Sequence, residues 1–179
     1  MLLMVFALET PRLILNELTK NDRADLHRIL SDPITMQYYP APYDWAGTEA
    51  WIDRSISSYY DHGYGLWAIC LRSSRQFIGQ GGILDVEIDG EILPEIGYHI
   101  HRDMWNQGLG TEAAQATLDY GFRTLKLPDL FIHTWIRNIP SRRVAEKLGM
   151  TRTKEFDKVM PRYDLTWRHV VYHKHHPQY

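Results

Sequence analysis

Hydrophobic spacing along the chain changes repeatedly between the pattern of a strand and the pattern of a helix. Apolar or alternating runs predict strands at 6–18, 66–71, 77–84, 95–101, 130–136 and 165–175. Apolar residues three and four positions apart predict helices around 26–30, at about 48–60, at about 111–125 and from 138 to about 149. This alternation is typical of an α/β fold, and 179 residues fit a single domain spanning 1–179.

A glycine-rich turn links the strand 95–101 to the helix that follows it. The turn reads WNQGLGT at 105–111. Gly108 and Gly110 have no side chain to keep an anion off the backbone, and they tolerate the positive φ values that turn N–H groups inward. A helix opening near Thr111 adds unpaired N–H groups and the positive end of its dipole. The turn predicts a pyrophosphate site, although many helices simply begin after a glycine turn.

A second strand and helix follow in the same order. The strand 130–136 is apolar, and the segment 138–150 reads NIPSRRVAEKLGM. Pro140 suits a first helical turn and Gly149 suits a left-handed helix end. The apolar face of this helix consists of Val144, Ala145 and Leu148.

Four stretches together resemble the GNAT superfamily of acyl-CoA N-acyltransferases, most closely its branch of ribosomal-protein N-terminal (alanine) acetyltransferases. They are LETPRLIL at 8–15, FIGQGGI at 77–83, and the two segments 95–113 and 138–150. The resemblance implies a mixed α/β (α+β) fold with a mostly antiparallel central sheet of about seven strands. This sheet would be splayed in the middle and flanked by about four helices. The resemblance also implies direct transfer from acetyl-CoA to a primary amine.

The resemblance assigns residues to the cofactor. Those implied to bind acetyl-CoA are Tyr98, His99, Ile100, Gln107, Gly108, Leu109, Gly110, Thr111, Asn138, Ser141 and Lys147. A backbone N–H near Tyr98 or His99 would stabilise the oxyanion. Asn138 would hold the pantetheine amide, and it also suits a helix N-cap. Lys147 either reaches a CoA phosphate or is a solvated helix residue.

The chain departs from the superfamily pattern in two places. Trp105 stands where an Arg or Gln commonly begins the phosphate loop, and Ala145 stands where a Tyr often serves as general acid. Ser141 is then the matching polar residue for the leaving thiolate. A thiolate needs only modest help, so Ser141 would hydrogen-bond the sulfur or relay a proton from water.

Acyl transfer to an amine requires a base, because ammonium groups are protonated at neutral pH. Glu95 begins the strand that runs into the phosphate loop, where the resemblance places a catalytic glutamate. We expect burial to raise the pKa of Glu95 towards the neutral range. The alternative is an exposed strand-end residue or a structural partner for an arginine.

Aromatic residues predict the acceptor site. One cluster lies between the first two predicted helices, and a second falls in a predicted loop between the last two strands, which would form the opposite wall (Phe156, Met160, Tyr163 and Trp167). The expected substrate-binding residues are Tyr38, Tyr39, Tyr43, Trp45, Glu95 and Tyr163. An aromatic slot would accept a peptide N-terminus, a polyamine, an amino sugar or another small amine. Core packing is the alternative for some of these side chains.

Composition and charge narrow the classes of partner. Lys and Arg number 20 and Asp and Glu 22, a net charge of −2 that argues against nucleic acid or an anionic membrane as partner. The apolar segment Met1–Leu8 has no basic leader and reads as the ragged start of a core strand. One cysteine, Cys70, excludes an internal disulfide. We expect a cytoplasmic protein, monomeric or homodimeric.

The nine histidines do not predict a metal. His99 and His101 share a strand face, and His173, His175 and His176 lie close together, but no Cys or carboxylate cluster in the sequence accompanies either group. We expect no metal. The sequence therefore predicts an acetyl-CoA-dependent N-acetyltransferase that acts on a protein N-terminus or a small molecule such as an antibiotic, polyamine or amino acid. A non-catalytic CoA-binding sensor, or a generic α/β binding domain without CoA affinity, are the alternatives.

Overall fold

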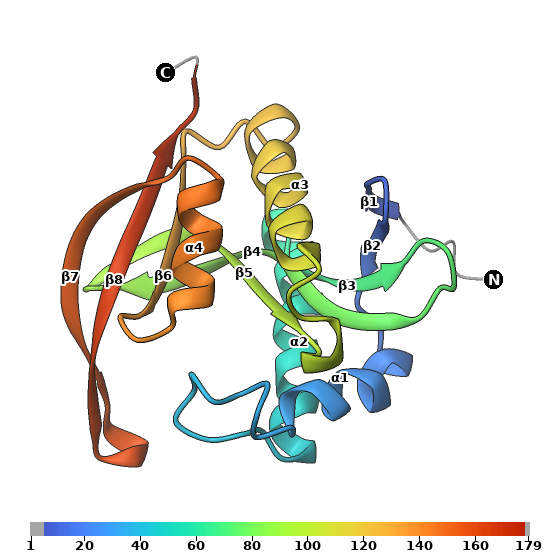
Figure 1. Cartoon of the computed structure of the whole chain (residues 1–179), viewed down its shortest axis with the longest axis horizontal. Coiled ribbons are helices and arrows are strands. Elements are labelled where there is room, and N and C mark those ends of the chain that lie inside the picture. Colours follow the sequence, from blue (N-terminus) through green and yellow to red (C-terminus); the bar gives the residue numbers. More distant parts are fainter. Residues whose placement is uncertain (1–5, 178–179) are drawn as a thin grey trace.

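The computed structural model describes residues 6–177 as one mixed sheet with helices on both faces (Figure 1). The strand order is β1-β2-β3-β4-β5-β6-β8-β7. The strands are β1 (Phe6–Glu9), β2 (Leu13–Glu17), β3 (Leu66–Leu71), β4 (Phe77–Ile88), β5 (Glu91–Ile100), β6 (Asp129–Trp135), β7 (Thr151–Met160) and β8 (Leu165–His175). The α-helices are α1 (Arg23–Leu30), α2 (Trp45–His62), α3 (Leu109–Arg123) and α4 (Ile139–Lys147). The mixed, mostly antiparallel sheet with four helices is confirmed, with one strand more than expected.

Two apolar clusters hold the helices to the sheet. On one face, Leu26 of α1 and Ile52 of α2 pack against residues of β3 and β4 such as Ala68 and Leu84. On the other face, α3 and α4 cover the sheet through residues that include Leu118 and Ala145. The sheet is therefore the middle layer of three, and its central strands are buried from both sides.

The predicted single strand at 6–18 is wrong. The chain forms two antiparallel strands, β1 and β2, and the segment between them turns at Pro11. The backbone N–H of Thr10 closes this turn on the carbonyl of Leu13 at 2.9 Å. Proline has no N–H to donate to a ladder, which favours a turn at this point. The expected ragged start at Met1–Val5 lies outside the described residues.

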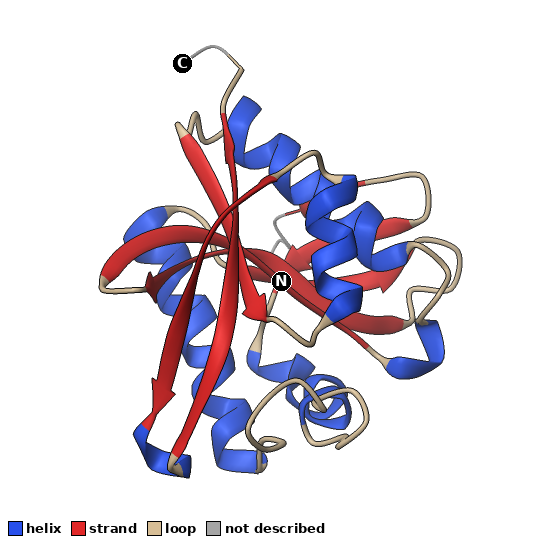
Figure 2. Cartoon of the chain, turned by 60° about the vertical axis from the view of Figure 1, so that its left-hand side comes forward, coloured by secondary structure: helices blue, strands red, loops and turns tan. Residues whose placement is uncertain are grey.

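The sheet splays between β5 and β6, as expected. β5 pairs with β4 along its whole length, from Gly79↔Ile100 to Ile88↔Glu91, across a hairpin whose turn residues Asp89 and Gly90 both have positive φ. β5 and β6, which run parallel, pair only at Glu95↔Phe131. Beyond this point the strands separate into two groups that run in different directions (Figure 2).

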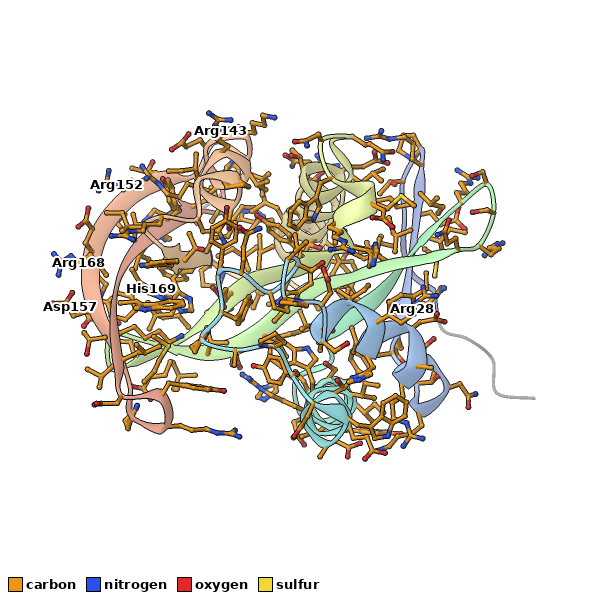
Figure 3. The ribbon with its side chains drawn as sticks, turned by 60° about the horizontal axis from the view of Figure 1, so that its bottom comes forward. Arg28, Arg143, Arg152, Asp157, Arg168 and His169 are labelled. Atoms are coloured by element: carbon orange, nitrogen blue, oxygen red, sulfur yellow. The ribbon has the colours of Figure 1, made fainter. Side chains whose placement is uncertain are left out.

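The predicted loop is wrong for three of its four aromatic and methionine residues, because Phe156 and Met160 lie on strand β7 and Trp167 lies on β8, while Tyr163 is in the turn between them. β7 pairs antiparallel with β8, and its outward side chains are polar, so it lacks a strong apolar alternation. Arg168 pairs with Asp157 across the hairpin at 3.2 Å. Figure 3 shows these two side chains on the outer side of the hairpin and His169 on the inner side. Within 6–177, no helix is long and apolar enough to cross a membrane.

Candidate active site

A cleft of about 1190 Å³ opens where β5 and β6 separate. It is lined by these two strands, the first turns of α3 and α4, the segment between α1 and α2, and the β7–β8 hairpin. Most of the residues predicted for the site line it: Tyr38, Tyr39, Tyr43, Glu95, Tyr98, His99, Ile100, Gly108, Leu109, Gly110, Thr111, Asn138, Ser141, Lys147 and Tyr163. Segments far apart in sequence therefore meet in one cavity.

Two predicted residues do not line the cleft. The side-chain amide of Gln107 lies 3.3 Å from the carbonyl of Asp103, on the outside of the loop. Trp45 is the first residue of α2, and its ring packs edge-on against His27 with 4.8 Å between ring centroids. Trp51, six residues further along α2, lines the cleft instead.

The glycine turn forms a compact helix start. α3 begins at Leu109, two residues before the predicted Thr111, and Gly108 at its N-cap has a φ of +76°. The expected positive φ is thus confirmed at Gly108 and wrong at Gly110, which lies inside the first helical turn. The first N–H groups of α3 have no acceptor within the helix and face the cleft together with its positive dipole end. These groups fit a pyrophosphate.

Arg12 fixes this loop from the opposite side. Its Nη1 donates to the carbonyl of Gln107 at 2.8 Å, and its Nε donates to Oε2 of Glu112 at 2.6 Å. Glu112 also accepts a hydrogen bond from the hydroxyl of Thr10 at 2.6 Å. Thr10 and Arg12, which flank Pro11, therefore connect the start of β2 to the first turn of α3.

A pair of hydroxyl groups lies between β5 and α4. The hydroxyl of Tyr98 donates to Oγ of Ser141 at 3.2 Å. Burial raises the pKa of Tyr98 to about 12, so the phenol stays protonated. Because Ser141 accepts in this bond, its own O–H remains free to donate to a ligand. Ala145, at the position where the superfamily often has an acidic tyrosine, is fully buried in the core.

Asn138 is the N-cap of α4, which is one of the two roles predicted for it. Its Oδ1 accepts a hydrogen bond from the backbone N–H of Ser141 at 3.2 Å. Capping uses only the oxygen of the amide, and the NH₂ group stays available to a carbonyl in the cleft.

Glu95 lies at the single point where β5 pairs with β6. Its Oε1 accepts two hydrogen bonds from His133, one from the backbone N–H at 2.9 Å and one from Nδ1 at 2.5 Å. Burial acts to raise the pKa of Glu95, but His133, these hydrogen bonds and Lys158 outweigh it and lower the pKa. The expected rise is therefore wrong, and the carboxylate is ionised. The structural partner considered for Glu95 is a histidine rather than an arginine.

His133 and Lys158 extend this contact across the cleft. Nε2 of His133 lies 3.0 Å from Nζ of Lys158 on β7. The ring of His169 on β8 lies 5.2 Å from that of His133, between centroids. Sequence reasoning missed both His133 and Lys158. The alternation of β6 puts His133 on the same face as Phe131 and Trp135, but nothing local indicates that Lys158 faces it.

His99 is a neutral, buried donor that lines the cleft, with its ring 5.0 Å from that of Tyr39 between centroids. Nε1 of Trp51 donates to Oε1 of Gln80 at 3.0 Å, which directs the NH₂ group of Gln80 to Nδ1 of His99 at 3.1 Å. The proton of His99 is therefore on Nε2, which has no hydrogen-bond partner among residues 6–177. Burial lowers the pKa of His99 to about 4.

A carboxylate joins two of the C-terminal histidines, contrary to the expectation from sequence. The β6–β8 register places Asp129 opposite His175, and Oδ1 of Asp129 lies 2.7 Å from Nε2 of His173. The possible ligand atoms of these three residues lie within 4.8 Å of one another. None of the three lines the cleft.

Comparisons with known proteins agree with this geometry. The family model described as an acetyltransferase (GNAT) domain matches residues 12–151. The chain is 34% identical to the uncharacterised protein YkkB of Bacillus subtilis, over 84% of this chain and 88% of YkkB. A GNAT-family acetyltransferase from Bacillus anthracis has a TM-score of 0.80 at 27% identity, covering 96% and 99% of the two chains.

A structure of RimL, titled a ribosomal L7/L12 alpha-N-protein acetyltransferase in complex with coenzyme A, is also similar in fold. Its TM-score is 0.77 at 16% identity, over 96% of this chain and 98% of RimL. Since the family model covers most of the chain, the protein belongs to the GNAT family and is an acetyltransferase.

Proposed function

We propose that this protein transfers the acetyl group of acetyl-CoA directly to a primary amine, with Glu95 supplying the base. One observation carries the proposal. A single cleft presents a helix N-terminus at one end, the Tyr98–Ser141 hydroxyl pair in its middle and an ionised carboxylate where the sheet splays. Anion binding, leaving-group stabilisation and proton removal are the three requirements of this reaction.

The cofactor would lie along the edge of β5 that the splay exposes. The first turn of α3 at Gly108–Thr111 binds the pyrophosphate, and the NH₂ group of Asn138 binds a pantetheine carbonyl. Beyond Glu95 no strand formed by residues 6–177 pairs with β5 on the β6 side, so residues 98–100 can hydrogen-bond the pantetheine arm and the oxyanion. Lys147 lines the same end of the cleft and can reach a phosphate. The coenzyme A bound to the similar fold of RimL supports this placement.

The reaction removes two protons from the acceptor nitrogen. The first leaves the ammonium for the base before attack. The free amine then adds to the thioester carbon, the carbon–sulfur bond breaks, and the second proton neutralises the thiolate. Ser141, whose oxygen already accepts a hydrogen bond from Tyr98, stabilises the leaving sulfur with a hydrogen bond from its own O–H. Tyr98 therefore orients the serine for the leaving group.

The acceptor is, in our proposal, the N-terminus of a protein or peptide. The cleft is lined by four basic and four acidic side chains: Arg54, Arg143, Lys147 and Lys158 against Glu87, Asp89, Glu95 and Asp157. A polyamine or an aminoglycoside would favour a predominantly acidic site. Tyr38, Tyr39, Tyr43 and Tyr163 supply an aromatic wall that suits peptide side chains. A cytoplasmic location, the absence of a metal, a monomer or homodimer, and one domain over 1–179 belong to the same proposal.

Thiol release from acetyl-CoA tests the proposal against its alternatives. The panel contains peptides with free N-termini, polyamines, aminoglycosides and amino acids, and the same peptides with blocked N-termini serve as controls. Release with free but not blocked peptides is the expected result. Release only with small amines would identify a small-molecule acetyltransferase. CoA binding without release on any amine would identify a sensor, and no CoA binding would contradict the cofactor site itself.

A further inference from the structure

The geometry points to a proton relay in which the amine of Lys158 takes the proton of the acceptor ammonium and His133 and Glu95 hold it there. This inference rests on the proposed function. It replaces Glu95 by Lys158 as the group that contacts the substrate and takes the proton, and it leaves Glu95 to supply the negative charge that stabilises the protonated lysine. Neither His133 nor Lys158 belongs to the residues expected from the sequence.

The hydrogen bonds define how protons are placed in the relay. Glu95 is ionised and can only accept, so Nδ1 of His133, at 2.5 Å from Oε1, carries a proton. Nε2 of His133 and Nζ of Lys158 lie 3.0 Å apart, and one proton between them satisfies both nitrogens. Before proton uptake Lys158 is a neutral amine beside a neutral imidazole, and an N–H of the amine donates to Nε2 of His133. After uptake Lys158 is an ammonium that donates to the same nitrogen, and Glu95 balances its positive charge.

Lys158 lacks the direct carboxylate partner that keeps most lysines charged. Among residues 6–177 it makes no ion pair, whereas Lys154, four residues earlier on β7, pairs with Asp89 at 2.9 Å and with Glu91 at 3.8 Å. Burial of Lys158 lowers its pKa, which makes the neutral amine accessible. A neutral lysine is a far better base for an ammonium than an ionised buried carboxylate whose pKa is lowered.

Charged and titratable groups from five elements surround Lys158. Those that face it are Glu95 on β5, His133 on β6, His169 on β8, Glu87 on β4 and Arg54 on α2. Burial lowers the pKa of His169 to about 3, so its ring stays neutral beside His133 and does not compete for the proton. His133 has Glu95 on one nitrogen and Lys158 on the other. All three residues line the cleft, but the side chains of His133 and Glu95 are only 8% and 15% exposed, and Lys158 is the end of the chain of contacts that an incoming ammonium would meet.

The proton balance of the relay is simple. The acceptor R–NH₃⁺ gives one proton to the neutral Nζ of Lys158, and the resulting R–NH₂ attacks the thioester. Lys158 becomes an ammonium that donates to Nε2 of His133, and Glu95 compensates its charge through Nδ1–H. The relay returns to its neutral form when Lys158 loses this proton to water after the product leaves.

Two substitutions of Lys158 separate a proton acceptor from a fixed positive charge. Lys158→Arg keeps a positive charge and hydrogen-bond donors but cannot accept a proton. We expect it to lower turnover at neutral pH by roughly 10²-fold or more, the lower range of general base catalysis. Lys158→Met loses both the charge and the proton acceptor, so its turnover at neutral pH should fall as far, whereas a lysine needed only for its charge would be replaced by arginine without loss. Lys154→Met is the matched control on the same strand and should leave turnover unchanged.

A measurement on the free protein keeps the relay testable without turnover. Nitrogen-15 NMR of the side chains should show His133 protonated on Nδ1 and Lys158 titrating at lower pH than Lys154. Wild-type activity in Lys158→Arg would overturn the relay, and so would a Lys158 that titrates together with Lys154. If the wild type binds acetyl-CoA but acetylates no amine, the proposed function fails, and the NMR result alone then decides whether the shared proton exists.

Discussion

Glu95 and His133 are joined by two hydrogen bonds at the point where the central sheet opens. The carboxylate accepts both the backbone N–H and Nδ1 of His133. Because β5 and β6 pair only at Glu95↔Phe131, the N–H of His133 has no strand partner on that side. The side chain of Glu95 replaces the missing backbone acceptor. The same carboxylate therefore stabilises the separation of β5 and β6 that creates the cleft. In the proposed relay it also supplies the negative charge that stabilises protonated Lys158.

Substitution in the phosphate loop should abolish cofactor binding. Gly110→Glu places a negative carboxylate at the first turn of α3, where the pyrophosphate must lie. A Cβ at Gly110 would meet only Ile100 and Tyr98 at ordinary contact distances, 3.7 Å and more, so Gly110→Ala is a folded control that should bind CoA. Calorimetric titration with CoA compares the two. Equal affinity in Gly110→Glu and wild type would place the cofactor elsewhere. Gly108 is the less suitable position, because its φ of +76° strains any other residue.

Loss of the Ser141 hydroxyl should slow turnover moderately and leave CoA affinity unchanged. Ser141→Ala removes one hydrogen bond to the leaving sulfur, which corresponds to roughly a threefold to tenfold lower rate. Tyr98→Phe should have a smaller effect in the same direction, because Ser141 loses only its orienting donor. Steady-state rates with slow and fast acceptor amines check this. An unchanged rate in Ser141→Ala for both amines would mean that water, and not Ser141, donates the hydrogen bond to the leaving thiolate.

The lowered pKa of Glu95 predicts a dependence of stability on pH. A carboxyl whose pKa is lower in the folded than in the unfolded protein contributes its full stability above the unfolded value and loses it as the pH falls. The ordinary value is 4.5. The free energy of unfolding of wild type minus that of Glu95→Gln should therefore be constant above this pH and shrink below it. Urea unfolding across the acidic range measures it. A difference that grows on acidification would contradict the lowered pKa.

Metal removal should not affect turnover. Asp129, His173 and His175 are the one group of possible ligands found in the described part of the chain, and none of them lines the cleft. Acetylation rates after dialysis against a chelator should equal those before it, and Asp129→Asn should retain full activity. A rate that falls on chelation and returns with zinc would require a metal in the account.

The parts of the site that could be predicted are those encoded in contiguous sequence. The phosphate loop and the start of α4 each occupy one turn plus one helix, so local chemistry identifies Gly108, Asn138 and Ser141. Trp45 was misplaced because Asp44 caps α2, its Oδ1 accepting the N–H of Gly47 at 2.7 Å. The helix thus begins three residues before the expected Thr48 and turns Trp45 towards α1.

The proton-transfer partners could not be predicted, because they depend on pairing between distant strands. His133 meets Glu95 through a parallel register of a single residue pair. Lys158 reaches His133 from β7, an edge strand whose charged residues Lys154, Glu155 and Asp157 read as a loop. The pKa of Glu95 was predicted in the wrong direction for the same reason. Burial alone raises it, and the two partners that lower it are invisible in the sequence.

The most direct test of the account is the pH dependence of acetyl transfer by Glu95→Gln. Thiol release from acetyl-CoA and formation of the acetylated amine are measured together, and the two should be equal in the wild type. Glutamine keeps the shape of the side chain but carries no charge, so turnover at neutral pH should fall roughly 10²–10⁴-fold with CoA affinity little changed. The deficit should disappear as the pH approaches the pKa of the acceptor, because the amine then arrives unprotonated. A deficit that stays constant over this range would show that Glu95 only supports the splay and takes no part in proton removal.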